Sequence, residues 1–270
     1  MNSKKVLYIS QEIFPYLPEN GMAVYSRYLP EKAAEGGHDV RIFMPKYGVI
    51  NERRNQLHEV IRLSGINVIV DDSDHPLIIK VASVPSSHLQ VYFIDNDEFF
   101  KRKSMFEATP KGGNDNPERA IFFIRGALEA IKKLRWIPDV VHCLGWFSAL
   151  APLYLKTLYK DDPAFGKAKV VFTLHNEETL GEMGSELPQR MKFDHITSEM
   201  LQPMAGEYSV RALRRLAMHY ADGIVVASEK LNPELEQDLK AIDGKPILRL
   251  HDLNAEGVAQ AYKDFYASLE

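Results

Sequence analysis

The chain has 270 residues, of which 45% are hydrophobic and 26% are charged, and this is the composition of an ordinary globular protein. Its formal net charge of −4 argues against a general nucleic-acid binder, which would carry a basic excess. The single cysteine, Cys143, excludes an internal disulfide framework and fits a reducing compartment, and no apolar run reaches the length of a membrane span. We therefore expect a cytoplasmic protein that binds neither nucleic acid nor a membrane.

The chain opens with a strand–helix–strand unit. Val6–Ser10 is an apolar, β-branched run that predicts a buried strand, an amphipathic helix is predicted from about Ala23 to Glu35, and Val40–Met44 is the next strand. Two strands joined by a helix in this length pair in parallel. Because ligands sit at the carboxyl ends of parallel strands, the loop at residues 11–21 is the first place to look for a site.

The rest of the chain continues the same pattern. Further strands of the main sheet are predicted at Val140–His142, Val170–Leu174 and Ile224–Ala227, with helices between them. Short β-rich runs between residues 57 and 94, the first at Leu57–Leu63, predict a hairpin-rich insertion that returns to this sheet. Two more helices complete the prediction: one over residues 229–240, capped by Ser228, and a terminal one over residues 254–269. The sequence thus predicts an α/β protein: a single Rossmann-like, three-layer domain over residues 1–270 with a mostly parallel sheet.

Several stretches resemble the opening half of bacterial glycogen synthases and plant starch synthases. They are Ser10–Tyr16, Gly21–Ala23, Gly37–Val40, Met44–Gly48, Pro138–Trp146 and Phe172–Asn176. The resemblance implies the N-terminal half of a GT-B glycosyltransferase, a fold with two Rossmann-like domains and the active site between them. It also implies glucose transfer from ADP-glucose to an α-1,4-glucan or maltooligosaccharide, with no cofactor and no metal.

The opening loop departs from the family's pattern. The synthases carry a Lys-x-Gly-Gly motif that meets the phosphates of the donor, whereas the matching positions here are Pro18, Glu19, Asn20 and Gly21. The lysine is absent, a glutamate stands beside its place, and Gly21 is the one glycine retained. Phosphate binding needs amide donors or positive charge, so this loop is expected to bind ADP-glucose weakly.

His175 and Asn176 follow the strand Val170–Leu174 directly and are expected on the ligand-facing edge. They match the synthases' Phe-Thr-Ile-His-Asn motif, whose histidine contacts the transferred glucose, so the resemblance makes His175 the candidate catalytic residue and Asn176 a substrate-binding one. An imidazole there can donate to a sugar hydroxyl or stabilise charge on a leaving phosphate. The alternative is a histidine that only closes the strand end by hydrogen bonding.

Four further residues are candidates for substrate binding: Tyr16, Gly21, His142 and Trp146. The last two match a His-x-x-Asp-Trp motif of the synthases, except that Gly145 stands at the carboxylate position. A tryptophan beside a sugar site can stack on a pyranose face, although buried tryptophans more often belong to the core.

The second GT-B domain, which would supply most nucleotide contacts, is expected to be absent from this chain. This leaves two hypotheses open. The chain is a glucosyltransferase domain that needs a second domain in trans, or it is a non-catalytic glucan-binding or regulatory module of glycogen metabolism. The edge that would face the missing domain is expected to expose apolar side chains, among them Tyr16, Leu17, Met22 and Trp146, which favours a partner chain, a homo-oligomer or bound glucan.

Overall fold

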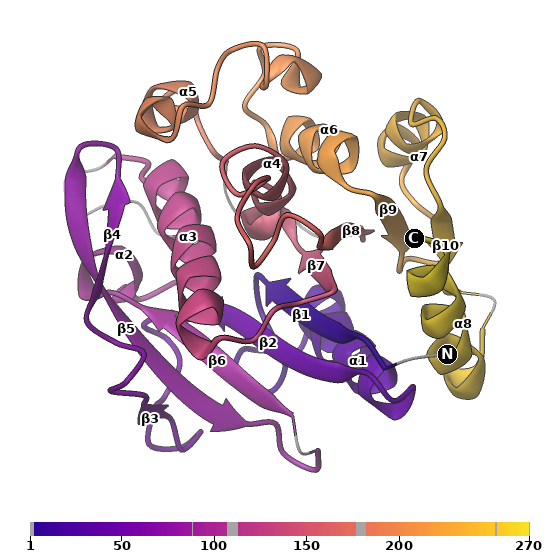
Figure 1. Ribbon diagram of the computed structural model, residues 1–270, viewed down its shortest axis with the longest axis horizontal. Coiled ribbons are helices and arrows are strands. Elements are labelled where there is room, and N and C mark those ends of the chain that lie inside the picture. The colour runs from indigo at the N-terminus through magenta and orange to yellow at the C-terminus, as the bar shows by residue number, and fades with distance from the viewer. Residues whose placement is uncertain (1–2, 88, 107–112, 177–181, 252, 270) are drawn as a thin grey trace.

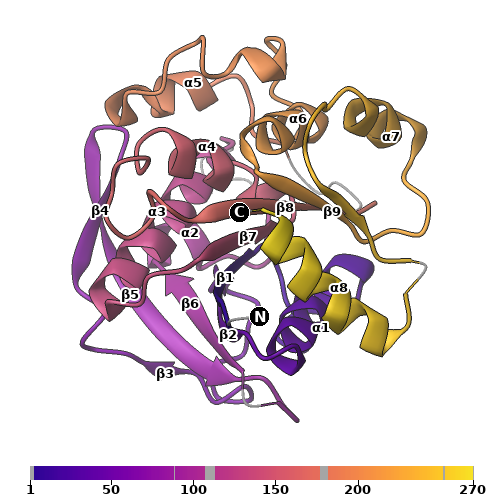
Figure 2. The same ribbon diagram turned by 45° about the vertical axis from the view of Figure 1, so that its right-hand side comes forward.

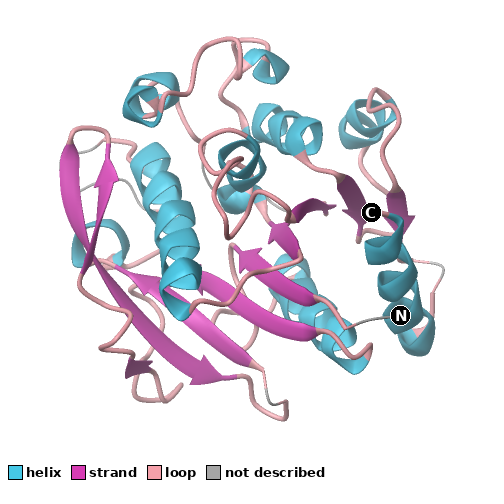
Figure 3. Ribbon diagram, in the orientation of Figure 1, coloured by secondary structure: helices cyan, strands magenta, loops and turns pink. Residues whose placement is uncertain are grey.

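The structure is a computed structural model that describes residues 3–87, 89–106, 113–176, 182–251 and 253–269. The helices, together with the short 3₁₀ turns at residues 146–148, 192–194 and 202–204, are distributed along the whole chain (Figure 3). The strands are β1 Lys5–Ser10, β2 Asp39–Pro45, β3 His58–Glu59, β4 Ile66–Val70, β5 Ser73–Ser83, β6 Gln90–Asp95, β7 Val140–Leu144, β8 Lys169–Leu174, β9 Gly223–Val226 and β10 Ile247–Arg249. The helices are α1 Gly21–Glu35, α2 Asp97–Phe100, α3 Asn116–Leu134, α4 Ala151–Lys156, α5 Leu187–Arg190, α6 Val210–Tyr220, α7 Pro233–Lys240 and α8 Ala255–Ser268.

One twisted sheet runs through the molecule in the order β10-β9-β8-β7-β1-β2-β6-β5-β3, and β4 pairs with β5 (Figure 1). The strands from β10 to β6 are parallel, while β5 runs antiparallel to β6 and forms hairpin-like pairs with β3 and β4. The predicted α/β class and mostly parallel sheet are confirmed, and all of the predicted main-sheet strands lie in this sheet. The strands of the insertion return to it through β6, as expected.

Helices cover both faces of the sheet. Right-handed crossovers place α1 on one face, because the chain moves from β1 to β2, and α3, α4 and α6 on the other, because it then moves back through β7, β8 and β9. The central strands are therefore buried on both sides, and Val6, Leu7, Tyr8 and Ile9 of β1 are fully buried. None of the described helices is long and apolar enough to cross a membrane.

The terminal helix α8 packs beside α1 on the same face of the sheet (Figure 2). The hydroxyl of its Tyr266 lies 2.9 Å from that of Tyr8 in β1 and 2.8 Å from Nδ1 of His142 in β7. The prediction of a terminal helix is thus confirmed. It packs against this face of the sheet and not over the edge where the strands end.

Two local predictions were wrong. Alternating residues predicted a strand over Leu57–Leu63, but only β3 pairs, because the chain turns back at Val60, whose carbonyl accepts the N–H groups of Leu63 and Ser64. Ser228 does not cap a helix: α7 begins later, where the side chain of Asn232 accepts the N–H of Leu235 at 2.9 Å.

Candidate functional site

The loops that follow β1, β7 and β8 meet at one edge of the sheet, because these strands are parallel neighbours. We call this edge the rim. The helix α1 begins at the rim, since the side-chain oxygen of Asn20 accepts the N–H of Ala23 at 2.8 Å and so caps its first turn. His175 follows the last residue of β8 at the same edge.

Gly21 and His175 are brought into direct contact. A Cβ atom at Gly21 would lie 2.7 Å from Cε1 and 3.0 Å from Nε2 of His175, distances that only a glycine allows. The ring of Tyr25, one turn further along α1, lies 5.1 Å from the imidazole, centroid to centroid. The structure therefore joins two residues that the sequence placed far apart, and it packs the imidazole against the first turn of α1.

The imidazole of His175 is half-buried, and its Nδ1 atom is buried with no hydrogen-bond partner among the described residues. Burial lowers the pKa of His175 below its ordinary value, and the charge of Arg214 on α6 lowers the pKa further. A neutral imidazole has one donor nitrogen and one acceptor nitrogen, so it suits a hydroxylated ligand.

The loop before α1 is held by a carboxylate at its base. Glu12 is buried, and its two oxygens accept hydrogen bonds from Gln11 at 2.9 Å and from Asn20 at 2.8 Å. Further along, Pro18 and Glu19 are exposed. The described part of this loop, residues 11–21, thus contains no cation that could face a phosphate.

Known proteins resemble this chain in sequence and in fold. A family model described as the starch synthase catalytic domain matches residues 5–246. The chain belongs to this family. It is 39% identical over 198 residues to a glycogen synthase from Chlorobium limicola, covering 73% of this chain and 40% of that protein. It is 37% identical over 236 residues to a glycogen synthase from Chlorobaculum tepidum, covering 87% of this chain and 48% of that protein. The chain thus spans less than half the length of the curated relatives that it matches.

The fold is also similar to the catalytic domain of starch synthase IV from Arabidopsis thaliana, solved with bound ADP and acarbose. The TM-score is 0.70 at 20% sequence identity, and the match covers 99% of this chain and 50% of that one. This likeness shows the fold alone, and it agrees with the predicted half of a GT-B glycosyltransferase.

Gly145, which stands at the carboxylate position of the family's His-x-x-Asp-Trp motif, has no room for a side chain in this structure. Gly145 has a φ angle of +84°, and a Cβ atom on it would lie 2.6 Å from Cβ of Gln11. The side-chain oxygen of Gln11 accepts the N–H of Phe147 at 3.1 Å. Gln11 therefore fills the space beside the position where the synthases place a carboxylate.

His142 does not reach the rim. It is fully buried, stacked on Tyr8 with the ring centroids 4.9 Å apart, and its two ring nitrogens lie 2.8 Å from the hydroxyl of Tyr266 and 2.6 Å from Oγ1 of Thr173. Burial lowers the pKa of His142 to about 3, so the imidazole is neutral. The helix α8 covers this side chain, and from the sequence alone that packing was not expected.

Trp146 and Tyr16 are also turned inward. Trp146 is fully buried against Phe106, with the centroids 4.9 Å apart, and Tyr16 is 5% exposed and packs edge-on against Phe93. Leu17 and Met22 are buried as well. The expectation of an exposed apolar rim was therefore wrong, because the opening loop folds its own apolar side chains into the core. These side chains give no support to self-association through the rim.

Asn176 is exposed but engaged in the fold. Its backbone N–H donates to Oγ of Ser228 at 2.8 Å, its side-chain NH₂ donates to the carbonyl of Lys230 at 2.6 Å, and its side-chain oxygen accepts the N–H of Asn232 at 3.0 Å. The residue fixes the connection between β9 and α7. Because these three groups are all hydrogen-bonded within the fold, Asn176 supports the rim beside His175.

A pocket of 530 Å³, which we call the rim pocket, opens at the rim between the opening loop and the segment after α2. It is lined by Tyr16, Leu17, Pro18, Val49 and residues 103–106. Its volume lies in the range of small-molecule sites.

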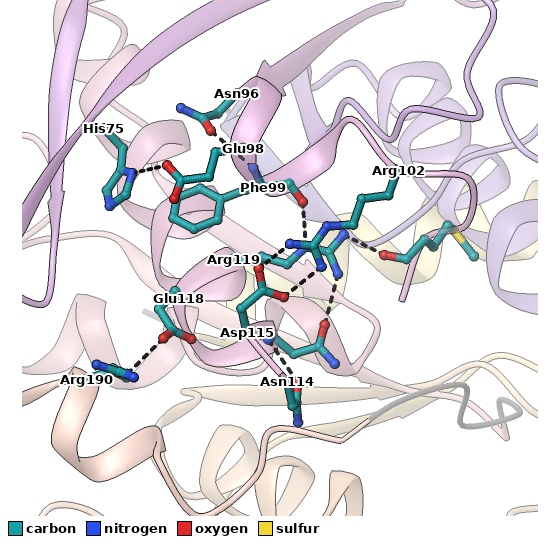
Figure 4. Close-up of polar contacts among 12 residues, drawn as sticks. His75, Asn96, Glu98, Phe99, Arg102, Asn114, Asp115, Glu118, Arg119 and Arg190 are labelled. Carbon is teal, nitrogen blue, oxygen red and sulfur yellow. Dashed lines mark hydrogen bonds and ion pairs between the residues drawn. The ribbon is translucent and has the colours of Figure 1, made fainter. Parts of the chain in front are cut away.

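A buried arginine holds the segment that lines one wall of the rim pocket. Figure 4 shows its contacts. Arg119 of α3 is fully buried and donates hydrogen bonds to the carbonyls of Phe99 at 2.8 Å and Met105 at 2.5 Å. Beside it, Arg102 forms a two-point ion pair with Asp115, one contact of which measures 2.7 Å. Burial lowers the pKa of Arg119 to about 10, which keeps the guanidinium charged at neutral pH. These contacts fix the path of residues 99–106, so the pocket wall is formed before any ligand arrives.

The described residues contain no group of three or more His, Cys, Asp or Glu side chains that could hold a metal ion. Sequence reasoning missed Gln11 and Tyr25, which act through contacts across the rim. It also missed Arg214 of α6, which is buried, whereas its neighbours Arg211 and Arg215 pair with the carboxylates of Asp238 and Glu207.

Proposed function

We propose that this domain takes part in transferring glucose from ADP-glucose to an α-1,4-glucan or maltooligosaccharide. The observation that carries the proposal is the contact between Gly21 and His175 at the rim of a starch synthase family domain, with Nδ1 of His175 lacking a partner among the described residues. The starch synthase IV structure of the same fold holds ADP and acarbose, which supports this donor and this class of acceptor.

In the reaction, the oxygen of an acceptor hydroxyl forms a bond to C1 of the glucose, and the bond from C1 to the phosphate oxygen breaks. ADP leaves with the electron pair, and its phosphate oxygen takes up the proton that the hydroxyl loses. His175 is proposed to hydrogen-bond the transferred glucose. Because its pKa is lowered, it does so as a neutral group that orients the sugar and does not add a charge. Gly21 allows the imidazole to approach α1 closely enough to take this position.

The diphosphate of the donor needs positive charge that the opening loop does not provide, because Pro18 and Glu19 stand at the start of the motif. We therefore propose that the domain works with a second domain that supplies this charge across the rim. A cytoplasmic location is proposed with it, since the lone Cys143 fits a reducing compartment.

The test is a transfer assay with purified protein, ADP-glucose and glycogen that measures release of ADP. The chain is assayed alone and together with the C-terminal half of the Chlorobaculum tepidum glycogen synthase. We expect transfer only in the mixture, and its loss in His175→Ala. The matched control is His219→Ala, which removes an exposed histidine of α6 and should leave transfer unchanged.

A glycogen co-sedimentation assay on the same proteins separates the two hypotheses. Binding of the chain to glycogen without transfer in either preparation would favour the non-catalytic glucan-binding module. Transfer that survives His175→Ala would refute the proposed role of this residue.

A further inference from the structure

A second pocket, with a volume of 580 Å³, lies away from the rim. One wall is formed by Arg54 and Gln56, in the segment between β2 and β3, and by His58 at the start of β3. The opposite wall comes from the end of β5 and from Gln90 at the start of β6. Because β6 is parallel to the central strands, its first residue marks the edge of the sheet opposite to the rim. Tyr16 is the one residue that the lining of this pocket shares with that of the rim pocket. We call this cavity the lateral pocket.

The mouth of the lateral pocket is polar and the floor is apolar. Arg54, Gln56 and His58 are exposed, and the side chains of these three make no hydrogen bond or ion pair to any other described residue. Ala82 and Val84 are buried and form the floor. Polar groups without partners around an apolar base are the usual composition of a small-molecule site.

The wall that carries these polar groups is fixed in place. The side-chain oxygen of Asn51 accepts the N–H of Arg54 at 2.8 Å, which closes a tight turn. The carboxylate of Glu52 pairs with Lys46 at 2.6 Å and with Lys80 at 2.8 Å, tying the segment to β2 and β5. Gln56 has a φ angle of +53°, an unusual conformation for a residue with a side chain. Such backbone strain persists where the surrounding structure enforces it, and it is often found at ligand sites.

The chemistry of the lining selects the class of ligand. Among the described residues that line the pocket, Arg54 is the only one with a permanent charge, and none carries a carboxylate. The nearby Arg27 is engaged with Glu31 at 3.0 Å and with the carbonyl of Pro85 at 2.9 Å. A nucleotide or another polyanion would meet too little positive charge here. A sugar chain, which is neutral and has an apolar ring face edged by hydroxyls, matches both the polar mouth and the apolar floor.

We propose that the lateral pocket is a second binding site for an α-glucan chain, separate from the rim. The choice of an α-glucan among neutral saccharides rests on the proposed function. A domain that acts on a branched polymer gains from such a site, because a chain held at one point raises the local concentration of the other chain ends at the rim.

The test is a titration of the ¹⁵N-labelled full chain with maltoheptaose, without any sugar-nucleotide donor, followed by NMR. The amide signals of residues 53–58 and 82–84 should shift. Arg54→Ala removes a charged hydrogen-bond donor from the mouth and should weaken this binding about tenfold. Gln90→Ala, on the opposite wall, should weaken it by a smaller factor.

Arg53→Ala is the matched control, because Arg53 is exposed in the same turn and does not line the pocket. It removes the same charge and should leave the affinity unchanged. Equal affinities for Arg54→Ala and Arg53→Ala would overturn the proposal, as would an absence of shifts in wild type at millimolar maltoheptaose. Shifts of these amides with pyrophosphate in place of the sugar would also overturn it, in favour of an anion site.

The two proposals fail separately. His175→Ala should bind maltoheptaose at the lateral pocket as wild type does, because His175 does not line that pocket. If the lateral pocket binds maltoheptaose but the chain never transfers glucose, the proposed function is rejected and the lateral site stands. If the chain transfers glucose to maltoheptaose but the lateral pocket does not bind it, the lateral site is rejected and the proposed function stands.

Discussion

The backbone of Gly145 lies against the side chain of Gln11. A Cβ atom at position 145 would lie 2.6 Å from Cβ and 2.8 Å from Oε1 of Gln11, and the φ angle of Gly145 is +84°. Both features exclude an ordinary side chain, although the family's motif has an aspartate there. The acidic group cannot be restored by a single substitution without moving the loop that begins at Gln11.

Gly145→Asp should therefore destabilise the protein by about 2–5 kcal/mol, through backbone strain and overpacking together. Urea unfolding measures this loss. Gly244→Asp is the matched control, because Gly244 has a φ angle of +71° but no described atom within 4 Å of the place that a Cβ atom would take. It should cost only about 1–2 kcal/mol, from strain alone. Equal losses at the two positions would show that the contact with Gln11 is not important.

Gly21→Ala should displace the imidazole of His175 with little change in stability, because alanine favours the helix that starts there. The expected results are a shift of the His175 ring signals in NMR and a loss of transfer in the mixed assay. In the His175→Ala background the same substitution should have no further effect, since its target is gone. If the losses were additive in the double variant, Gly21 would act through a group other than His175.

His142 should make the protein sensitive to acid. Its pKa is lowered from 6.5 to about 3 by burial, so the unfolded chain binds more protons than the folded one over this range. The free energy of unfolding should therefore fall as the pH drops below about 6.5, by on the order of a few kcal/mol by pH 4. His142→Asn should show a shallower slope of stability against pH, whatever its stability at neutral pH. An unchanged slope would mean that the pKa of His142 is the same in the folded protein as in the unfolded chain.

The isolated chain should bind ADP-glucose weakly or undetectably, because Pro18 lacks an amide proton and Glu19 repels phosphate. Pro18→Lys, which restores the cation of the family's motif, should increase the affinity measured by calorimetry, by about tenfold at low salt. Gln260→Lys, on the distant helix α8, adds the same charge and should have no effect. Micromolar binding by the unmodified chain would contradict this prediction.

The main sheet was predictable because its strands are short apolar runs bounded by loops, and Val6–Ser10 or Val170–Leu174 leave few alternatives. The start of α7 was not, because both Ser228 and Asn232 are good capping residues. The choice between them was made by Asn176, which takes the hydroxyl of Ser228 with its own N–H. A tertiary contact therefore determines where α7 begins, which the local sequence alone did not.

The same limit applies to the site. His175 was predicted at the rim because it directly follows a strand, and Gly21 because it lies in the opening loop. His142 also ends a predicted strand, yet it is buried, since Tyr266 approaches it from 124 residues away. Position at a strand end predicts the edge of the sheet, but only tertiary packing shows which side chains that edge exposes.

The hydrogen bond between Tyr8 and Tyr266 has a consequence for folding during synthesis of the protein. The two hydroxyls are separated by 258 positions in sequence, and between them lies nearly all of the chain. The strand β1 therefore leaves the ribosome long before the helix that shields its tyrosine. During synthesis one face of β1 and the imidazole of His142 therefore remain uncovered by α8. Folding is completed only after translation has passed residue 266.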